Sequence, residues 1–184
     1  MNNKVYDGMN KGLELIHQGF KIRNDIWQEE ILFSWRWWIG FGLVIFCWGS
    51  WMIFRKKNSS DRLFYPGLFV MVISIALDAI GLQLKAWNYI YPLIPFFPAY
   101  LPFDLALMPV SVMFLIQVKP KMKPFYKAIL FAVLTSFFGE PLFKWLGIYE
   151  PLSWRYIYSV PVYFVIYLTA NWLSKRPNFE RLNE

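Results

Sequence analysis

The sequence predicts an all-α integral membrane protein, with about five transmembrane helices in a bundle preceded by an amphipathic N-terminal helix. Hydrophobic residues occupy 57% of the 184 positions and charged residues only 17%, whereas soluble chains carry about 25% charged residues. The hydrophobic residues form blocks, and the basic residues lie mostly between alternate blocks. This composition excludes a disordered chain, and the single cysteine, Cys47, excludes a disulfide scaffold and a thiolate metal site.

Residues 1–34 precede the first apolar block and have amphipathic character. Their apolar positions recur at near-helical spacing, on one face of a helix: Leu13, Ile16, Phe20, Trp27 and Ile31. We expect this helix either to lie in the outer membrane interface or to pack on the loops of the protein itself. His17 is the only histidine, so one chain cannot build a histidine-based metal site or a His–carboxylate triad.

A transmembrane helix needs about 20 mostly apolar residues, and five stretches within residues 35–173 approach that length. The predicted spans are 37–54, 63–84, 101–118, 125–145 and 157–173. The first run begins too late and is too long to be a cleavable signal peptide. The third span carries Pro109 and the fifth carries Pro161, so these two depart most from a regular apolar helix.

Eleven of the 19 basic residues lie on one predicted side of the membrane, with three acidic residues. They flank the spans in three groups: Arg55, Lys56, Lys57 and Arg62; Lys119, Lys121, Lys123 and Lys127; and Lys175, Arg176 and Arg181. Basic flanks face the cytoplasm, so the N-terminus is predicted outside and residues 174–184 form a short basic cytoplasmic tail. Because topology accounts for the net charge of +7, nucleic acid is not expected as a partner.

The connection from Ala86 to Phe103 interleaves aromatic residues with four prolines. Prolines at this density prevent a regular helix, and aromatic rings favour the headgroup level of a membrane. We expect a semi-rigid strap in the outer interface. It either anchors the protein there or covers a pocket beneath it.

Three acidic residues lie inside predicted spans: Asp78, Asp104 and Glu140. A charge at the centre of a bilayer costs on the order of 3 kcal/mol, and the predicted topology places all three at similar depth in the outer half. We expect them to converge on one site, as candidate catalytic acid/base or cation-stabilising groups. The alternative is a structural clamp between helices, although interhelical hydrogen bonds contribute only about 0.6 kcal/mol each.

Two lysines and three aromatic residues accompany these acids. Lys144 follows Glu140 by four positions and Lys85 follows Asp78 by seven, so each lysine could pair with an acid or extend to the interface. The candidate ligand-binding residues are Lys85, Trp87, Tyr89, Lys144 and Tyr149. We expect no metal and no cofactor.

The sequence also contains a faint internal repeat. Asp78, Lys85, Trp87 and Tyr89 are echoed by Glu140, Lys144, Trp145 and Tyr149, and Pro-Val follows each set at 109–110 and 161–162. Both predicted hairpins run from inside to outside and back. They would therefore form a parallel repeat, as some membrane proteins do.

Several motifs resemble those of a family of small multi-pass membrane proteins, of uncharacterised activity, found chiefly in spore-forming Gram-positive bacteria. The motifs are Leu77-Asp78-x-x-Gly81, Trp87-x-Tyr89, Pro102-x-Asp104-Leu105, Gly139-Glu140-Pro141 and Trp145-Leu146-Gly147-Ile148-Tyr149. The resemblance covers most of the chain from Trp35 onwards and implies a bacterial plasma membrane. More distantly, the chain is similar to the integral-membrane lycopene cyclase domain, in which a Pro-x-Glu-Glu/Asp motif supplies the acid that protonates a polyene. That similarity implies a counterpart role for Asp104, with one of the two acids retained.

Three functions fit these observations, and the sequence leaves open whether the protein is an enzyme. In the first, the acids line a pocket that binds a lipophilic or isoprenoid-like ligand or a membrane lipid, either with or without a reaction on it. The second is a proton- or cation-coupled transport element. The third is a non-enzymatic protein that binds another membrane protein. The oligomeric state is not predicted.

Overall fold

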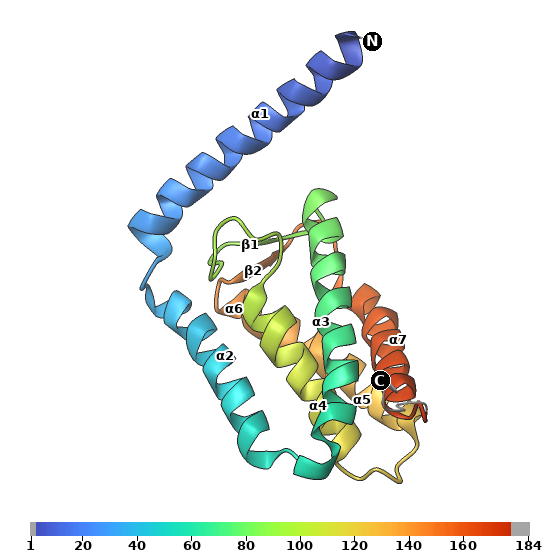
Figure 1. Ribbon diagram of the computed structural model, residues 1–184. Coiled ribbons are helices and arrows are strands. Elements are labelled where there is room, and N and C mark those ends of the chain that lie inside the picture. The colour runs from blue at the N-terminus through green and yellow to red at the C-terminus, as the bar shows by residue number, and fades with distance from the viewer. Residues whose placement is uncertain (1–2, 178–184) are drawn as a thin grey trace, which may run out of the picture.

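The computed structural model describes residues 3–177, which form a nearly all-α fold (Figure 1). The helices are α1 (Asn3–Ile26), α2 (Trp35–Phe54), α3 (Ser60–Gln83), α4 (Met108–Gln117), α5 (Pro124–Leu134), α6 (Glu140–Trp145) and α7 (Tyr156–Ser174). Two short strands are β1 (Trp87–Tyr89) and β2 (Tyr149–Pro151). Three π-helical segments cover Trp27–Ile31, Phe103–Leu107 and Thr135–Gly139, and a 3₁₀ turn covers Lys57–Ser59.

Within residues 3–177, four helical segments are long and apolar enough to cross a membrane. They are Trp35–Phe54, Lys57–Gln83, Pro124–Trp145 and Tyr156–Ser174, with 20, 27, 22 and 19 residues. These correspond to four of the five predicted spans. The third, predicted as 101–118, is a shorter apolar helix over Phe103–Gln117, which covers about 22 Å. The irregular strap before Phe103 and the Lys119-Pro120 pair after Gln117 limit its length.

The outer faces of these helices are strongly apolar. Ile53, Phe46, Val72 and Phe138 are 74%, 71%, 69% and 68% exposed. Large apolar side chains exposed on several helices in this way are unusual on a soluble monomer. The fold is therefore compatible with a membrane protein.

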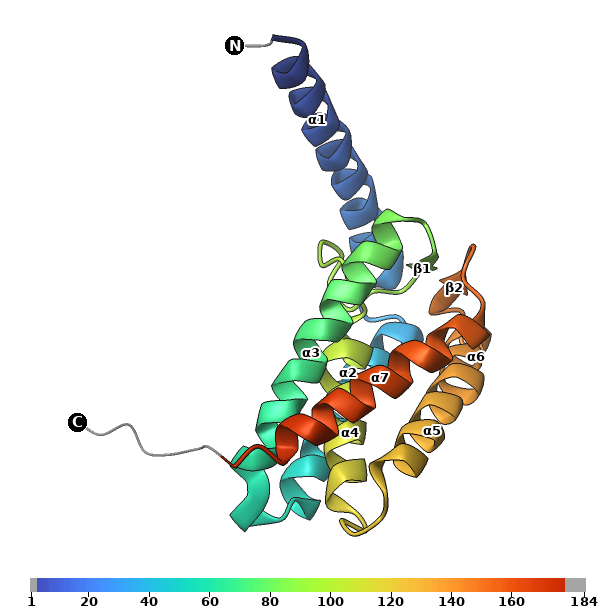
Figure 2. The same ribbon diagram turned by 90° about the vertical axis from the view of Figure 1, so that its right-hand side faces the viewer.

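Two helical hairpins form the centre of the bundle. The first contains α3 and α4, and the second contains α5, α6 and α7, with α3 packed against α7 (Figures 1 and 2). A buried apolar cluster joins α3, α4, α5 and α7, and it includes Val70, Met108, Val112, Ala128, Phe131, Ile166, Tyr167 and Ala170. The two hairpins therefore share one core.

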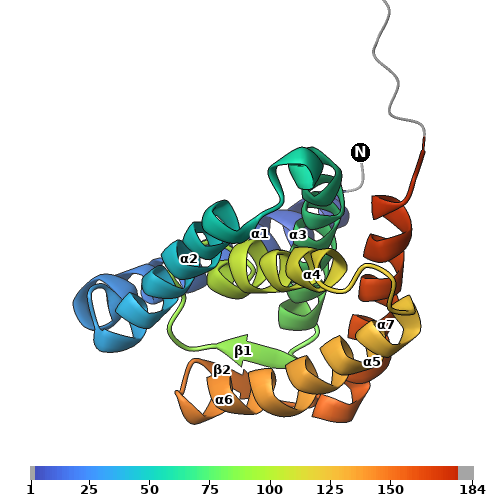
Figure 3. The same ribbon diagram turned by 90° about the horizontal axis from the view of Figure 1, so that it is seen from below.

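Helix α2 packs on the outside of the first hairpin, beside α4 (Figure 3). The Trp48 Nε1–H donates to the Leu105 carbonyl at 3.0 Å. In a regular helix that carbonyl would accept from the residue four positions later, but Pro109 has no N–H. The indole thus satisfies a carbonyl that the proline leaves free, and the proline is tolerated in an apolar environment.

Helix α1 projects away from the bundle at the end that carries β1 and β2 (Figures 1 and 2). None of its residues is buried. Its C-terminal part approaches the strap, where Phe20 and Asn24 share a shallow hollow with Pro95 and Phe96. The rest of α1 does not pack on loops, so its apolar stripe is open along most of its length.

The strap is irregular over residues 90–100, as its prolines predict. Its carbonyls are satisfied from outside: Trp27 Nε1–H donates to Pro92 O at 3.0 Å and Trp37 Nε1–H to Leu93 O at 3.1 Å. The sequence did not predict that the start of the strap forms β1, which pairs antiparallel with β2. This pairing ties the strap to the second hairpin.

Lys127 has a structural role at the opposite end of the bundle. Its side chain is 4% exposed, and Nζ donates to Leu115 O at 2.8 Å and Val118 O at 2.6 Å. These carbonyls end α4 without intrahelical partners. By its position in the sequence Lys127 is a charge flanking a span, whereas in the structure it caps the neighbouring helix.

Candidate functional site

Helices α3 and α6 end in the same pattern of backbone hydrogen bonds. At the end of α3, Leu84 N–H donates to Ile80 O, Lys85 N–H to Leu82 O and Ala86 N–H to Gly81 O, at 2.9, 3.1 and 2.8 Å. At the end of α6, the residues 62 positions later repeat the pattern: Leu146 to Leu142, Gly147 to Lys144 and Ile148 to Phe143, at 2.9, 2.9 and 3.0 Å. Lys85 and Gly147 both adopt positive φ, 53° and 72°, as this type of helix end requires.

The strand pair extends the same relationship. Asn88 pairs with Glu150, again 62 residues apart. Beside them, Ile90 N–H donates to Ile148 O and Leu152 N–H donates to Ala86 O, both at 2.9 Å. The same offset relates Asp78 to Glu140 and places a buried serine, Ser74 or Ser136, four residues before each acid.

The repeat therefore differs in detail from the one read from the sequence. The equivalence of Asp78 and Glu140 is retained. However, Trp87 corresponds to Tyr149 rather than to Trp145, and Lys85 corresponds to Gly147 rather than to Lys144. The structural register, set by backbone hydrogen bonds, corrects an alignment based on aromatic and basic residues alone.

A cavity of about 100 Å³ lies between the two hairpins, below the strand pair. All three acids predicted from the sequence line it: Asp78, Asp104 and Glu140. The remaining lining is mostly aromatic, with Trp87, Tyr89, Phe103, Phe143, Tyr149, Trp154 and Tyr163. The structure thus brings acids from three helical segments to one cavity.

Asp78 is the most fully hydrogen-bonded of the three. Its Oδ1 accepts from Trp87 Nε1 at 3.2 Å and from the Tyr89 hydroxyl at 3.0 Å, and its Oδ2 accepts from the Tyr100 backbone N–H at 3.1 Å. Gly81, one turn after Asp78, allows the Trp87 ring to reach it, because a Cβ at Gly81 would overlap the indole. These contacts fix the carboxyl group between α3, β1 and the strap.

Asp104 lies in the π-helical segment Phe103–Leu107 and is 1% exposed. Its carboxyl group comes within hydrogen-bonding reach of Asp78. No donor reaches its Oδ2. Two carboxyl groups can bond to each other only when a proton or an external donor lies between them.

Glu140 is the first residue of α6, directly after the π-helical segment Thr135–Gly139. Its Oε1 accepts from the Tyr163 hydroxyl at 3.1 Å, and Ser159 also hydrogen-bonds the carboxyl group. Trp154 Nε1–H donates to Ser159 Oγ at 2.8 Å, which leaves the serine proton free to donate. Glu140 Oε2 is buried and has no partner. Insertions of π-helical turns are frequent at functional sites, and here they accompany two of the three acids.

The two candidate tyrosines outside the helices are neutral, and Tyr89 donates to Asp78. Burial raises the pKa of Tyr89 well above its usual range, and the nearby carboxyl groups of Asp78 and Asp104 add to that effect. Burial also raises the pKa of Tyr149, with a further contribution from Glu140. Both hydroxyl groups therefore keep their protons at neutral pH.

The structure separates the candidate ligand-binding residues into two groups. Trp87, Tyr89 and Tyr149 line the cavity. Lys85, in the turn after α3, and Lys144, in the last turn of α6, are exposed and do not line it. Neither lysine lies where it could neutralise the three acids.

Sequence reasoning missed Ser74, Trp154, Ser159 and Tyr163, which all line the cavity. Ser74 could have been found from its spacing, since Ser74 and Ser136 each precede an acid by four residues. Ser159 and Tyr163 lie in an apolar span without a charge to mark which face of the helix turns inward. Trp154 lies in the loop after β2, where no periodicity applies.

Within residues 3–177, no group of three His, Cys, Asp or Glu side chains is arranged to hold a metal ion. The groups that the cavity offers to a ligand are carboxyl groups, hydroxyl groups and aromatic rings. Comparisons of the chain with protein-family models, with curated proteins and with solved structures find no match.

Proposed function

We propose that this chain is a multi-pass plasma-membrane protein that binds, and acts on, a lipophilic or isoprenoid-like ligand in the cavity between its two hairpins. The observation that carries the proposal is the convergence of Asp78, Asp104 and Glu140 on one aromatic cavity inside an apolar bundle. Carboxyl groups buried at membrane depth are costly, and an intramembrane ionisable residue favours a functional site over a passive one.

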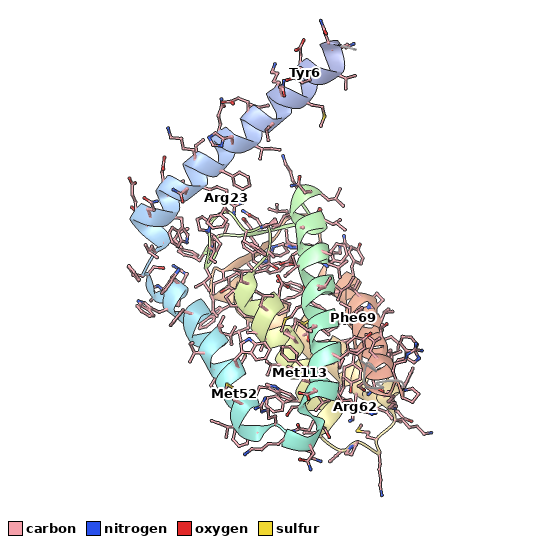
Figure 4. The ribbon with its side chains drawn as sticks, viewed as in Figure 1. Tyr6, Arg23, Met52, Arg62, Phe69 and Met113 are labelled. Atoms are coloured by element: carbon pink, nitrogen blue, oxygen red, sulfur yellow. The ribbon has the colours of Figure 1, made fainter. Side chains whose placement is uncertain are left out.

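The proposed orientation places the cavity in the outer half of the bilayer. The strands lie at one end of the bundle, and the α2–α3 and α4–α5 connections lie at the other (Figure 1). Trp87 and Tyr89 of β1 and Tyr149 of β2 line the cavity, so the cavity belongs to the strand end. Arg62 marks this second end, at the start of α3 (Figure 4). The basic residues flanking these connections face the cytoplasm by the positive-inside rule, so the N-terminus is outside.

The chemistry of the cavity supports proton transfer to a bound ligand. Asp104 and Glu140 each present an oxygen that no protein donor reaches, while Asp78 is held by three donors. A protonated acid beside an ionised one can protonate a ligand and stabilise the resulting positive charge. The resemblance of the Pro102-x-Asp104 motif to the lycopene cyclase domain is the reason to include isoprenoid-like ligands.

A transport function receives less support. The buried cluster around Val70, Val112 and Phe131 lies between the cavity and the basic end of the bundle, and it is apolar. Packed apolar side chains therefore separate a ligand in the cavity from the basic end of the bundle. Binding from the outer leaflet fits this arrangement better than passage across the membrane.

The proposal is tested by purifying the full chain in a mild neutral detergent and extracting bound lipophiles for mass spectrometry. We expect a lipophile to co-purify with the wild type and to be lost from Asp104→Asn and Glu140→Gln. Glu150→Gln is the matched control, because Glu150 is exposed on β2 and does not line the cavity. Equal retention of the lipophile by all variants would contradict the proposal, as would its absence from the wild type.

A further inference from the structure

We propose that the ligand carries a protonated amine with N–H donors, and that this head group binds among the three acids. The inference rests on the proposed function and names the chemical class of the ligand. The cavity is acidic: among its described lining residues three are acids, and no lining residue is Lys, Arg or His. The protein itself therefore supplies no cation to a buried acidic site.

Three acceptors that line the cavity lack hydrogen-bond donors. Asp104 Oδ2, Glu140 Oε2 and Ser74 Oγ are all buried without a hydrogen-bond partner, and all three residues line this cavity. Asp104 is 1%, Ser74 5% and Glu140 7% exposed, so water has little access to them from outside. A buried acceptor without a donor costs about 1–3 kcal/mol, and more when it is charged. A ligand that donates to these atoms would recover this cost.

A primary ammonium matches that set of acceptors. It offers three N–H donors and no acceptor, and three acceptors converge on the cavity. Its positive charge also compensates the negative charge of the carboxyl groups, which a neutral alcohol does not. A carboxylate or phosphate head group would add repulsion and would leave the same acceptors without donors.

The aromatic lining suits the same head group and the carbon chain attached to it. The faces of Trp and Tyr rings attract a cation by up to about 2 kcal/mol in a desolvated site. Trp87 and Trp154 lie edge to face, with ring centroids 5.2 Å apart. Tyr89 lies between Tyr100 and Tyr149, with centroids 5.2 and 5.7 Å from its own. A cavity of about 100 Å³ exceeds the room needed for one water several-fold, which leaves space for an ammonium and the first carbons of its chain.

The test measures binding of four probes with the same chain length to the full chain in neutral detergent, by isothermal titration calorimetry. The probes are octylamine, octyltrimethylammonium, octanol and octanoate. We expect octylamine to bind about tenfold or more tightly than the others. Glu140→Gln should remove this preference. Ser74→Ala, which removes an unpartnered hydroxyl and should fold normally, should weaken octylamine several-fold and leave octanol unchanged. Glu150→Gln should bind all four probes as the wild type does.

The outcomes separate this inference from the function on which it rests. Equal binding of octanol and octylamine overturns the amine assignment and leaves the lipophilic site in place. Equal binding of octyltrimethylammonium overturns the role of N–H donors, and tighter binding of octanoate overturns the charge argument. Failure of all four probes overturns both proposals. Competition by a short-chain phosphatidylethanolamine, but not by the corresponding phosphatidylcholine, would identify the amine as a lipid head group. If octylamine binds and phosphatidylethanolamine does not compete with it, the ligand is a free amine.

Discussion

Lys85 and Gly147 occupy equivalent turns, 62 residues apart, and both adopt the left-handed backbone conformation, with φ of 53° and 72°. The left-handed conformation favours glycine, so Gly147 suits it and Lys85 does not. The equivalence shows that α3 and α6 end in the same backbone motif although the side chains of the two turns differ. It also leads to a prediction about stability.

Lys85→Gly should stabilise the protein by about 1 kcal/mol, because a side chain costs about that much in the left-handed region. Gly147→Ala should destabilise it by a similar amount for the same reason. The measurement is the midpoint of thermal unfolding in detergent, followed by circular dichroism. Shifts of the same sign for both variants would contradict the equivalence of the two turns.

Gly81→Ala should disrupt the site, because the added Cβ would overlap the Trp87 indole and displace the donor that reaches Asp78 Oδ1. Overpacking of this kind costs about 1–3 kcal/mol. Gly42→Ala in α2 is the matched control, since nothing lies within 4 Å of its added Cβ. The unfolding midpoint should fall for Gly81→Ala alone, and an unchanged midpoint would argue against close packing of Trp87 on α3.

Tyr89→Phe removes one of the three donors to Asp78 and should cost about 1 kcal/mol. The loss is modest because Trp87 and the Tyr100 backbone N–H remain. A double-mutant cycle with Asp78→Asn measures the coupling directly in unfolding experiments. Full additivity of the two substitutions would show that the Tyr89 hydroxyl does not support the carboxyl group.

Lys127→Met should destabilise the protein by about 1–3 kcal/mol, because the Leu115 and Val118 carbonyls would lose their donor. Methionine keeps most of the side-chain volume, so the effect reports on hydrogen bonding rather than on a cavity. Lys123→Met is the control, since Lys123 is exposed four residues earlier. Equal effects of the two substitutions on the unfolding midpoint would mean that the cap contributes nothing.

The orientation is tested by cysteine labelling in intact cells, in a background that carries Cys47→Ala. Asn58→Cys lies between α2 and α3, and Glu150→Cys lies on β2 at the opposite end; both positions are exposed. A membrane-impermeant maleimide should label the cysteine at position 150 and should reach that at position 58 only after lysis. The opposite pattern would invert the topology and place the cavity in the inner leaflet.

The sequence could predict what depends on local composition. Apolar runs located four membrane-length helices, and the prolines between Ala86 and Phe103 predicted an irregular strap. The depth of Asp78, Asp104 and Glu140 along their helices predicted that they lie in one layer, because 1.5 Å of rise per residue converts position into height.

What depends on helix rotation and on contacts between distant segments could not be predicted. Tyr163 and Ser159 reach Glu140 only because one face of α7 turns towards the cavity, and α7 is apolar on every side. The exposed position of Lys85 accompanies a left-handed turn, and that of Lys144 depends on the rotation of α6; no charge pattern encodes either. Likewise, β1 and β2 are three residues each, too short to show alternation.

The 62-residue offset has a consequence for the symmetry of the cavity. One hairpin paired with a copy of itself would enclose a cavity on a true twofold axis, with identical acids on both sides. A single chain removes that constraint, so its halves can carry different groups. Asp104 has no acidic counterpart in α7. The cavity therefore has distinguishable sides, and an asymmetric molecule can be held in one direction only.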